Sequence, residues 1–152
     1  MLRRLDQHEI ELMPLRVILF DVDNLKLIND HYGHEKGDEA LRCCCRCIRE
    51  AFGEDISCYR IGGDEFVCLT ERVETFRADE ARFYEAKAEM AKTLDFPFSV
   101  SMGWASFDPQ TDRKLPDVIH RCDEMLYHNK EKKAKFVMPK DLSTASAESV
   151  DK

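Results

Sequence analysis

The feature that most constrains the fold is an apolar run, RVILFDVD, over residues 16–23, which closes on two acids, Asp21 and Asp23. A compact run rich in β-formers predicts a buried strand. Carboxylates are costly in such a core unless a counter-charge or solvent is at hand. For Asp21, inside the run, a functional and a structural role are equally good explanations. Asp23 precedes an expected helix and is better explained as its N-cap than as a ligand.

A second constraint is the tetrapeptide Gly62-Gly63-Asp64-Glu65, which separates two short β-rich runs at 56–61 and 66–70. This pattern predicts a hairpin. If the hairpin lies beside the first strand, Asp21 and Asp64 meet and form an oxygen site suited to Mg²⁺. The glycines leave room for another backbone or a nucleotide. The residues thus indicate metal-assisted phosphoryl or nucleotidyl transfer, although such a tetrapeptide alone is more often a polar turn.

The rest of the pattern mixes helices and strands. We expect helices at 2–12, 24–31, 36–52, 75–93 and 115–132, a strand at 98–107 and an edge strand at 136–138. Hairpins combined with helical crossovers predict an α+β fold, with a central, mainly antiparallel sheet flanked by helices. We expect residues 1–138 to form one domain and the small, polar residues 139–152 to form a disordered tail.

Composition excludes several classes of function. The net charge of −7 argues against nucleic-acid binding, which needs a basic footprint. No apolar run reaches the roughly 18 residues of a transmembrane helix, so we expect no membrane segment within this chain. The basic N-terminus is followed by charged residues rather than by the apolar core of a signal peptide. A cytoplasmic location is therefore expected.

Four of the seven cysteines, Cys43, Cys44, Cys45 and Cys47, crowd one segment. They lack the paired spacing of a zinc site. Neighbouring residues on a helix point about 100° apart, so these thiols cannot converge on one metal. We interpret them as small apolar helix residues in a reducing compartment.

Four ordered blocks within residues 15–132 resemble the GGDEF domain family of diguanylate cyclases. They are RIGGDEF at 60–66, FDVDNLKLIND at 20–30 with YGH at 32–34 and Gly37-Asp38, SVSMG at 99–103, and CDEMLYHNK at 122–130. The resemblance implies a nucleotidyl-cyclase, palm-like fold that binds GTP. It also implies condensation of two GTP molecules into cyclic di-GMP and pyrophosphate, with each subunit of a homodimer contributing one GTP half-site.

The resemblance further implies roles for individual residues. Asp21, Asp64 and the Val22 carbonyl would hold two Mg²⁺ or Mn²⁺ ions per active site, and Glu65 would be a further ligand or would help to deprotonate the ribose 3′-hydroxyl. The catalytic residues would then be Asp64, Glu65 and Asp21. The expected GTP contacts are Asn29 and Asp38 at the guanine edge, Leu25 and Leu41 along the pocket, and Lys26, Lys130, Gly62 and Gly63 around the phosphates. A single lysine is, however, more often a solvated surface charge.

The chain departs from the family pattern in three places. The usual Asp-x-Leu-Thr-Gly-Leu-x-Asn-Arg opening is absent, so we expect an upstream sensory domain outside this chain. The Arg and Asp of the family's product-inhibition site are replaced by Gly53 and Ile56, which predicts no inhibition there. Ala134 stands where a second phosphate-binding cation is expected, and Lys132, Lys133 or Lys135 would have to substitute.

Two alternatives to an active cyclase remain. One is a degenerate module that binds GTP and acts in regulation or scaffolding, which the replacement at Ala134 favours. The other is a structural dimerisation domain, which leaves the acidic strand end and the glycine turn unexplained. Intact Asp21, Asp64 and Glu65 favour catalysis. Mixed use of ATP and GTP stays open.

Overall fold

The computed structural model describes residues 15–54, 56–71 and 73–136. The elements in chain order are β1 (Arg16–Val22), α2 (Leu25–Tyr32), α3 (His34–Phe52), β2 (Ser57–Arg60), β3 (Glu65–Thr70), α4 (Phe76–Thr93), β4 (Val100–Ser106) and α5 (Leu115–Phe136).

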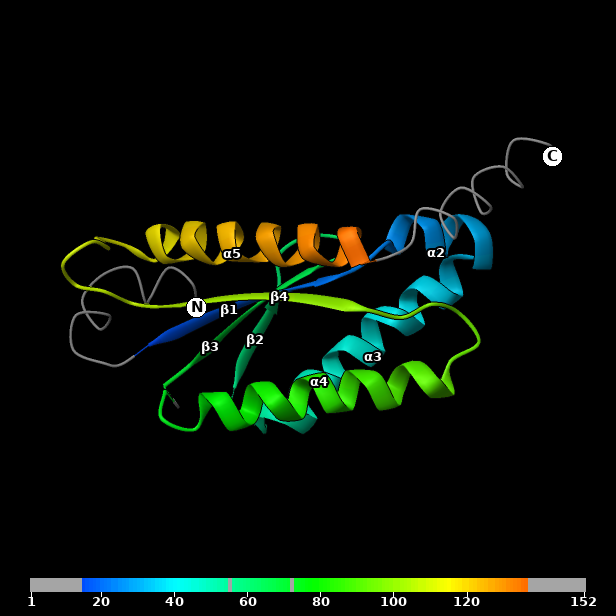
Figure 1. Cartoon of the computed structure of the whole chain (residues 1–152), viewed down its shortest axis with the longest axis horizontal. Helices are drawn as coiled ribbons and strands as arrows, with labels where there is room; N and C mark the ends of the chain where they lie inside the picture. The colour runs from blue at the N-terminus through cyan, green and yellow to red at the C-terminus, as the bar shows by residue number, and fades with distance from the viewer. Residues whose placement is uncertain (1–14, 55, 72, 137–152) are drawn as a thin grey trace.

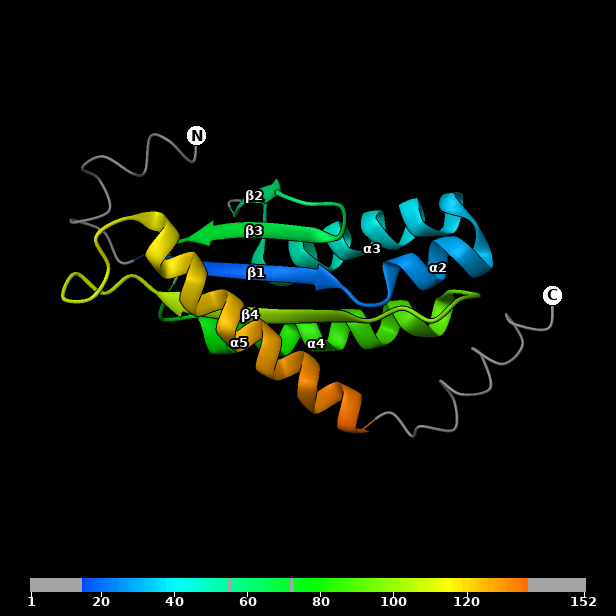
Figure 2. The same ribbon diagram turned by 90° about the horizontal axis from the view of Figure 1, so that it is seen from above.

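One antiparallel sheet with the strand order β2-β3-β1-β4 forms the centre of the fold (Figure 2). β1 lies inside the sheet and pairs with β3 on one side and with β4 on the other. The two β-rich runs around the glycine turn form the β2–β3 hairpin. The predicted α+β fold with an antiparallel sheet is therefore confirmed.

Helices cover both faces of the sheet, as Figure 1 shows: α5 lies along one face, and α3 and α4 lie along the other. Side chains alternate accordingly along β1. Ile18 and Phe20 belong to the core beneath α3 and α4, whereas Val17 and Leu19 belong to the core beneath α5. Both faces of β1 are buried, which is why its sequence is continuously apolar rather than alternating.

The backbone of α5 approaches β4 most closely at Gly103. A Cβ atom there would lie 2.3 Å from the Cys122 carbonyl oxygen and 2.5 Å from the Leu126 nitrogen. A side chain at this position would therefore push α5 away from the sheet. The glycine sets the distance between this helix and the strands beneath it.

The last helix is longer than predicted. α5 continues to Phe136, so the predicted edge strand is wrong at its first residue. Neither glycine nor proline occurs between Lys130 and Phe136, and nothing in that stretch stops a helix. The remainder of that segment, the helix expected at 2–12 and the tail at 139–152 lie outside the described residues.

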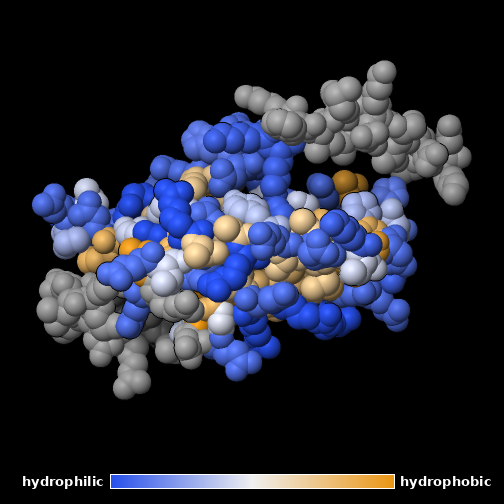
Figure 3. Space-filling model, turned by 60° about the horizontal axis from the view of Figure 1, so that its bottom comes forward, coloured by the Kyte–Doolittle hydropathy of each residue, from blue (hydrophilic) through white to orange (hydrophobic). Residues whose placement is uncertain are grey.

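The side of the molecule that carries α3 and α4 shows apolar residues interspersed among hydrophilic ones (Figure 3). Within the described parts of the chain, no helix combines the length and the apolar character needed to cross a membrane.

Candidate active site

Three carboxylates converge where β1 ends beside the β2–β3 hairpin. Asp21 of β1 is the register partner of Glu65 in β3, and Asp64 immediately precedes Glu65 in the turn. One oxygen from each of the three lies within 4.8 Å of the others. The antiparallel pairing of β1 with β3 thus brings together Asp21 and Asp64, which the hairpin pattern had predicted to meet.

Asp21 is buried, with 4% of its surface exposed. Its Oδ2 atom is ion-paired with Lys130 of α5, whereas Oδ1 is buried without a hydrogen-bond partner among the described residues. Burial is the main cause that raises the pKa of Asp21 to about 6; the Lys130 ammonium opposes this rise, and the Asp64 carboxylate adds to it. Buried polar atoms are almost always satisfied in native proteins, so an orphaned carboxylate oxygen points to a missing ligand.

A backbone oxygen supplements the acidic cluster. The Val22 N–H donates to the Asp64 carbonyl over 2.9 Å, but among the described residues the Asp64 N–H returns no bond to the Val22 carbonyl. The N–H and C=O of a residue in an antiparallel strand point to the same side. Because the Val22 N–H points to Asp64, the Val22 carbonyl also faces the turn. Three carboxylates and a carbonyl are the donor set that Mg²⁺ or Mn²⁺ prefers, and the residues fit such an ion.

Asp23 plays a different part from the one predicted. The N-cap of α2 is Asn24, in the left-handed region at φ 58°, and it makes no side-chain cap bond. The Asp23 carboxylate instead accepts hydrogen bonds from Ser101 Oγ at 2.7 Å and from Lys133 Nζ at 2.9 Å. The left-handed turn at Asn24 starts the helix at Leu25, so Asp23 lies just after the end of β1, where its side chain bonds to Ser101 of β4 and Lys133 of α5. The predicted N-cap role of Asp23 is therefore wrong.

Lys133 forms several hydrogen bonds around Asp23. Besides the Asp23 carboxylate, its Nζ atom donates to the Val100 carbonyl at 2.7 Å and to the hydroxyls of Ser99 and Ser101, each at 3.2 Å. Of the three lysines considered as substitutes for the cation lost at Ala134, this one is held at the sheet. Lys132 is exposed.

The glycine turn is braced from within the hairpin. Arg60 donates from Nε to the Gly62 carbonyl at 3.1 Å and from a terminal nitrogen to the Gly63 carbonyl at 2.7 Å. A Cβ atom on Gly63 would meet nothing within 4 Å. The protein itself does not require glycine there, and open space lies beside Asp64. The bracing role of Arg60 was not predicted, although an arginine two residues before a glycine turn is a usable signal for it.

The residues predicted to contact guanine lie on two packed helices. The Asn29 side chain of α2 rests on Gly37 of α3, where a Cβ atom would come within 1.7 Å of Asn29 Oδ1. Asp38, the next residue, is exposed. Leu41 is buried in the core, and Leu25 packs against the same core while staying half-buried. The structure thus places Asn29 beside the segment that carries Asp38.

The two lysines predicted at the phosphates differ in their surroundings. Lys26 is exposed on α2 and forms no ion pair within the described ranges. Lys130 bonds to the Asp21 carboxylate. The pKa of Lys130 is raised: burial alone would lower it, but the hydrogen bond and the charge of Asp21, with further acids nearby, outweigh burial.

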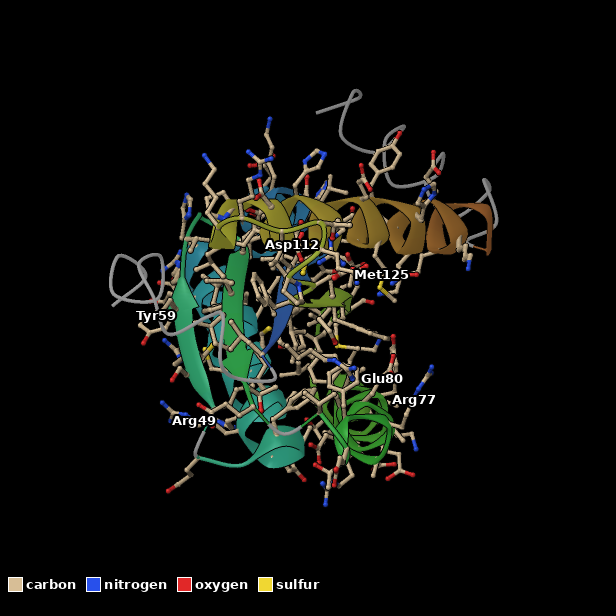
Figure 4. The ribbon with its side chains drawn as sticks, turned by 90° about the vertical axis from the view of Figure 1, so that its left-hand side faces the viewer. Arg49, Tyr59, Arg77, Glu80, Asp112 and Met125 are labelled. Carbon is tan, nitrogen blue, oxygen red and sulfur yellow. The ribbon has the colours of Figure 1, made fainter. Side chains whose placement is uncertain are left out.

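Two other charged groups among the described residues have clear partners, unlike the Oδ1 atom of Asp21. Asp112 lies under the first turns of α5 (Figure 4), where it is ion-paired with Arg121 and accepts the Asp108 N–H at 2.8 Å. The Arg16 guanidinium stacks on Phe76 and Trp104 at 4.2 and 4.4 Å from the ring centroids. Among the described residues, the other buried side-chain atom without a hydrogen-bond partner is Trp104 Nε1, which belongs to an uncharged side chain.

Comparison with known proteins identifies relatives along most of the chain. A family model described as "Diguanylate cyclase, GGDEF domain" matches residues 2–135. A diguanylate cyclase of Vibrio cholerae is 32% identical over 124 residues, 77% of this chain and 37% of the relative. Diguanylate cyclase DosC of Escherichia coli K12 is 38% identical over 120 residues, 75% of this chain and 26% of the relative.

A solved structure shows the same fold. The active GGEEF domain of a diguanylate cyclase from Vibrio cholerae superposes with a TM-score of 0.68 at 28% identity, covering 79% of this chain and 78% of that one. The chain spans about a third of the first curated relative and about a quarter of the second.

Proposed function

The chain belongs to the GGDEF domain family of diguanylate cyclases, and from this premise we propose that it condenses two GTP molecules into cyclic di-GMP and pyrophosphate. The observation that carries the proposal is the cluster of Asp21, Asp64 and Glu65, in which a buried Asp21 oxygen has no partner among the described residues. A buried carboxylate oxygen beside two further acids is costly without a cation to neutralise it.

The proposed roles follow from the donor set. Asp21, Asp64, Glu65 and the Val22 carbonyl would hold two Mg²⁺ or Mn²⁺ ions. Such ions, when bound, lower the pKa of an attacking hydroxyl and neutralise charge that develops on the phosphate and the leaving group. Because Lys130 uses only one oxygen of Asp21, the other oxygen is available without breaking this ion pair.

The substrate contacts proposed for this chain lie on α2, on α3 and at the glycine turn. Asn29 and Asp38 would hydrogen-bond the guanine edge, above Leu25 and Leu41. A site built for such bonds rejects adenine because the wrong base leaves polar groups unpaired. Lys26, which is exposed and unpaired among the described residues, and the open turn at Gly62 and Gly63 would accommodate the triphosphate.

A homodimer is part of the proposal because the product contains two equivalent phosphodiester bonds. Each bond joins the 3′-hydroxyl of one GTP to the α-phosphorus of the other. One domain offers one acidic cluster among its described residues, and so it holds one of the two reacting nucleotides. Two copies facing each other would supply both.

A second candidate function is a GTP-binding module without turnover. The observation in its favour is that Lys133, a candidate replacement for the cation lost at Ala134, is bound to Asp23 and to two serines. Fewer free cations near the phosphates would weaken the stabilisation of developing charge. The metal ligands proposed above are the same for both functions.

The test is incubation of the protein with GTP and Mg²⁺ or Mn²⁺ at high protein concentration, followed by chromatographic separation of the nucleotides. We expect cyclic di-GMP from the wild type and none from Asp64→Asn. The matched control Asp123→Asn, at an exposed acid on α5, should behave like the wild type. GTP binding without product would favour the binding module, and absence of GTP binding would refute both functions.

A further inference from the structure

Two cysteines face each other across the hairpin that carries Asp64 and Glu65. Cys58 of β2 and Cys68 of β3 are register partners. β2 is the edge strand of the sheet, and Cys58 is exposed whereas Cys68 is buried. The pair therefore combines one thiol that solvent can reach with one that lies in the core.

The hydrogen-bond pattern of the hairpin defines the spacing of this pair. The Ile61 N–H donates to the Glu65 carbonyl at 3.0 Å, so Ile61 and Glu65 form a hydrogen-bonded pair. Such pairs alternate with non-hydrogen-bonded ones, and three steps further along, Cys58 and Cys68 form a non-hydrogen-bonded pair. Their Cα atoms are then about 4.5 Å apart, at the short end of the range of about 4.4–6.8 Å that a disulfide spans.

The surroundings favour the thiolate at Cys58. A hydrogen bond from Cys68 is the main cause that lowers the pKa of Cys58; burial opposes it, and the Arg49 guanidinium supports it. Figure 4 shows Arg49 on the side of the sheet away from α5, near the edge formed by β2. Burial, followed by the bond to Cys58, raises the pKa of Cys68. An accessible thiolate beside a protected thiol is the arrangement of an attacking and a resolving cysteine.

We propose that Cys58 and Cys68 are a reversible dithiol–disulfide pair that peroxides oxidise. This modification site is independent of the nucleotide chemistry proposed above. The Cys58 thiolate attacks one peroxide oxygen, the O–O bond breaks, and the departing hydroxide takes up a proton to form water. Cys68 then attacks the sulfur of the resulting Cys58 sulfenic acid; the S–S bond forms, the S–O bond breaks, and the hydroxyl leaves with the Cys68 proton as a second water. Two thiols lose two electrons, and one peroxide is reduced.

The exposure of Cys58 leaves the disulfide accessible to reductants, as expected for a switchable bond rather than for a permanent one. The crosslink would tie together the two strands that lead into the turn bearing the acidic cluster. Two other thiols, Cys44 and Cys45 of α3, lie close enough for their charges to interact with Cys58. The β ladder places Cys68, not the helix thiols, directly opposite Cys58.

The protein's own cleavage sites make the test direct. Trypsin cuts after Arg49, Arg60 and Arg72, which leaves Cys58 alone in the peptide 50–60 and Cys68 alone in the peptide 61–72. The reduced full chain is treated with one equivalent of hydrogen peroxide, unreacted thiols are alkylated, and the digest is analysed by mass spectrometry without reductant. We expect these two peptides to be joined, with the loss of two hydrogens, and to separate again after dithiothreitol.

Two variants make the outcome decisive. Cys58→Ser, at an exposed position, should abolish the link, and circular dichroism shows whether the variant folds. Cys45→Ser, which removes the neighbouring helix thiol, should leave the link intact. A disulfide from Cys58 to Cys44 or Cys45, or over-oxidation of Cys58 without any disulfide, would overturn the proposal. Both results can be read whether or not the chain makes cyclic di-GMP.

Discussion

Asp21→Asn should stabilise the metal-free domain at neutral and alkaline pH, although it removes a proposed metal ligand. Burial raises the pKa of Asp21 from 3.8 to about 6 against the opposing effect of Lys130 and with a further contribution from Asp64. An acid whose pKa is higher in the folded than in the unfolded chain destabilises the fold once it is charged. At about 1.36 kcal/mol for each pKa unit, the charged carboxylate costs about 3 kcal/mol.

The pH dependence has a definite sign. Below 3.8 the Asp21 carboxyl is protonated in both states, so it adds no pH-dependent difference in stability. Between 3.8 and about 6 the unfolded chain releases its proton first, and the free energy of unfolding falls as the pH rises. Above about 6 the full cost is present. Asparagine has nearly the same shape and no charge, so the variant does not bear the free-energy cost of burying a charged carboxylate.

The measurement is urea unfolding in the presence of EDTA, followed by the fluorescence of Trp104, the only tryptophan in the chain. The free energies of unfolding of wild type and Asp21→Asn should be similar near about pH 4, and the variant should be more stable by about 3 kcal/mol near about pH 8. Added Mn²⁺ should stabilise the wild type and leave the variant unchanged, since only the native site binds the ion. A variant that is less stable at the higher pH, or a difference that does not depend on pH, would refute the reasoning.

Two further substitutions test the packing around the site. Gly103→Ala should lower the free energy of unfolding by about 1–3 kcal/mol, because its methyl group would collide with the backbone of α5, whereas Gly63→Ala, in open space, should change it far less. Equal denaturant midpoints for these two variants would contradict the close approach of α5. Gly37→Ala should displace the Asn29 amide and weaken GTP binding about tenfold, the equivalent of one lost hydrogen bond. Isothermal titration calorimetry with GTP and Mg²⁺ measures this, and an unchanged affinity would remove Asn29 from the proposed guanine contacts.

The sheet and the acidic cluster could be predicted from the sequence because their signals are local. The apolar run of β1 predicted a buried strand, and the glycine turn predicted a hairpin. Antiparallel pairing then allows only a few registers, and the observed one puts Asp21 opposite Glu65. The Cys58–Cys68 pair was also within reach, since the two residues are symmetric about the turn. The pattern of the helix cysteines, by contrast, contains no information about this pair.

The contacts of α5 could not be predicted in the same way. Asp23 and Lys133 are 110 positions apart, and no periodicity in either segment links them. Their contact depends on how α5 lies over the sheet, which the close approach at Gly103 determines. The N-cap assignment of Asp23 failed for the same reason, because a local capping rule competed with tertiary partners that sequence spacing does not reveal.

Lys130 and Lys133 of α5 bond to Asp21 and Asp23, respectively, and have separable roles. They lie three positions apart, about one helical turn, so both side chains leave the same face of the helix. Lys133 holds Asp23 with the help of backbone and hydroxyl groups of β4, and this network lies beside the acidic cluster without contributing a carboxylate to it. Among the described residues, Lys130 forms its hydrogen bond with Asp21, inside the cluster. Because the second oxygen of Asp21 can accept a cation while this ion pair persists, Lys130 would stay beside the proposed phosphate site, while Lys133 keeps the helix docked. On this reasoning Lys133→Met should loosen α5, whereas Lys130→Met should affect nucleotide binding first.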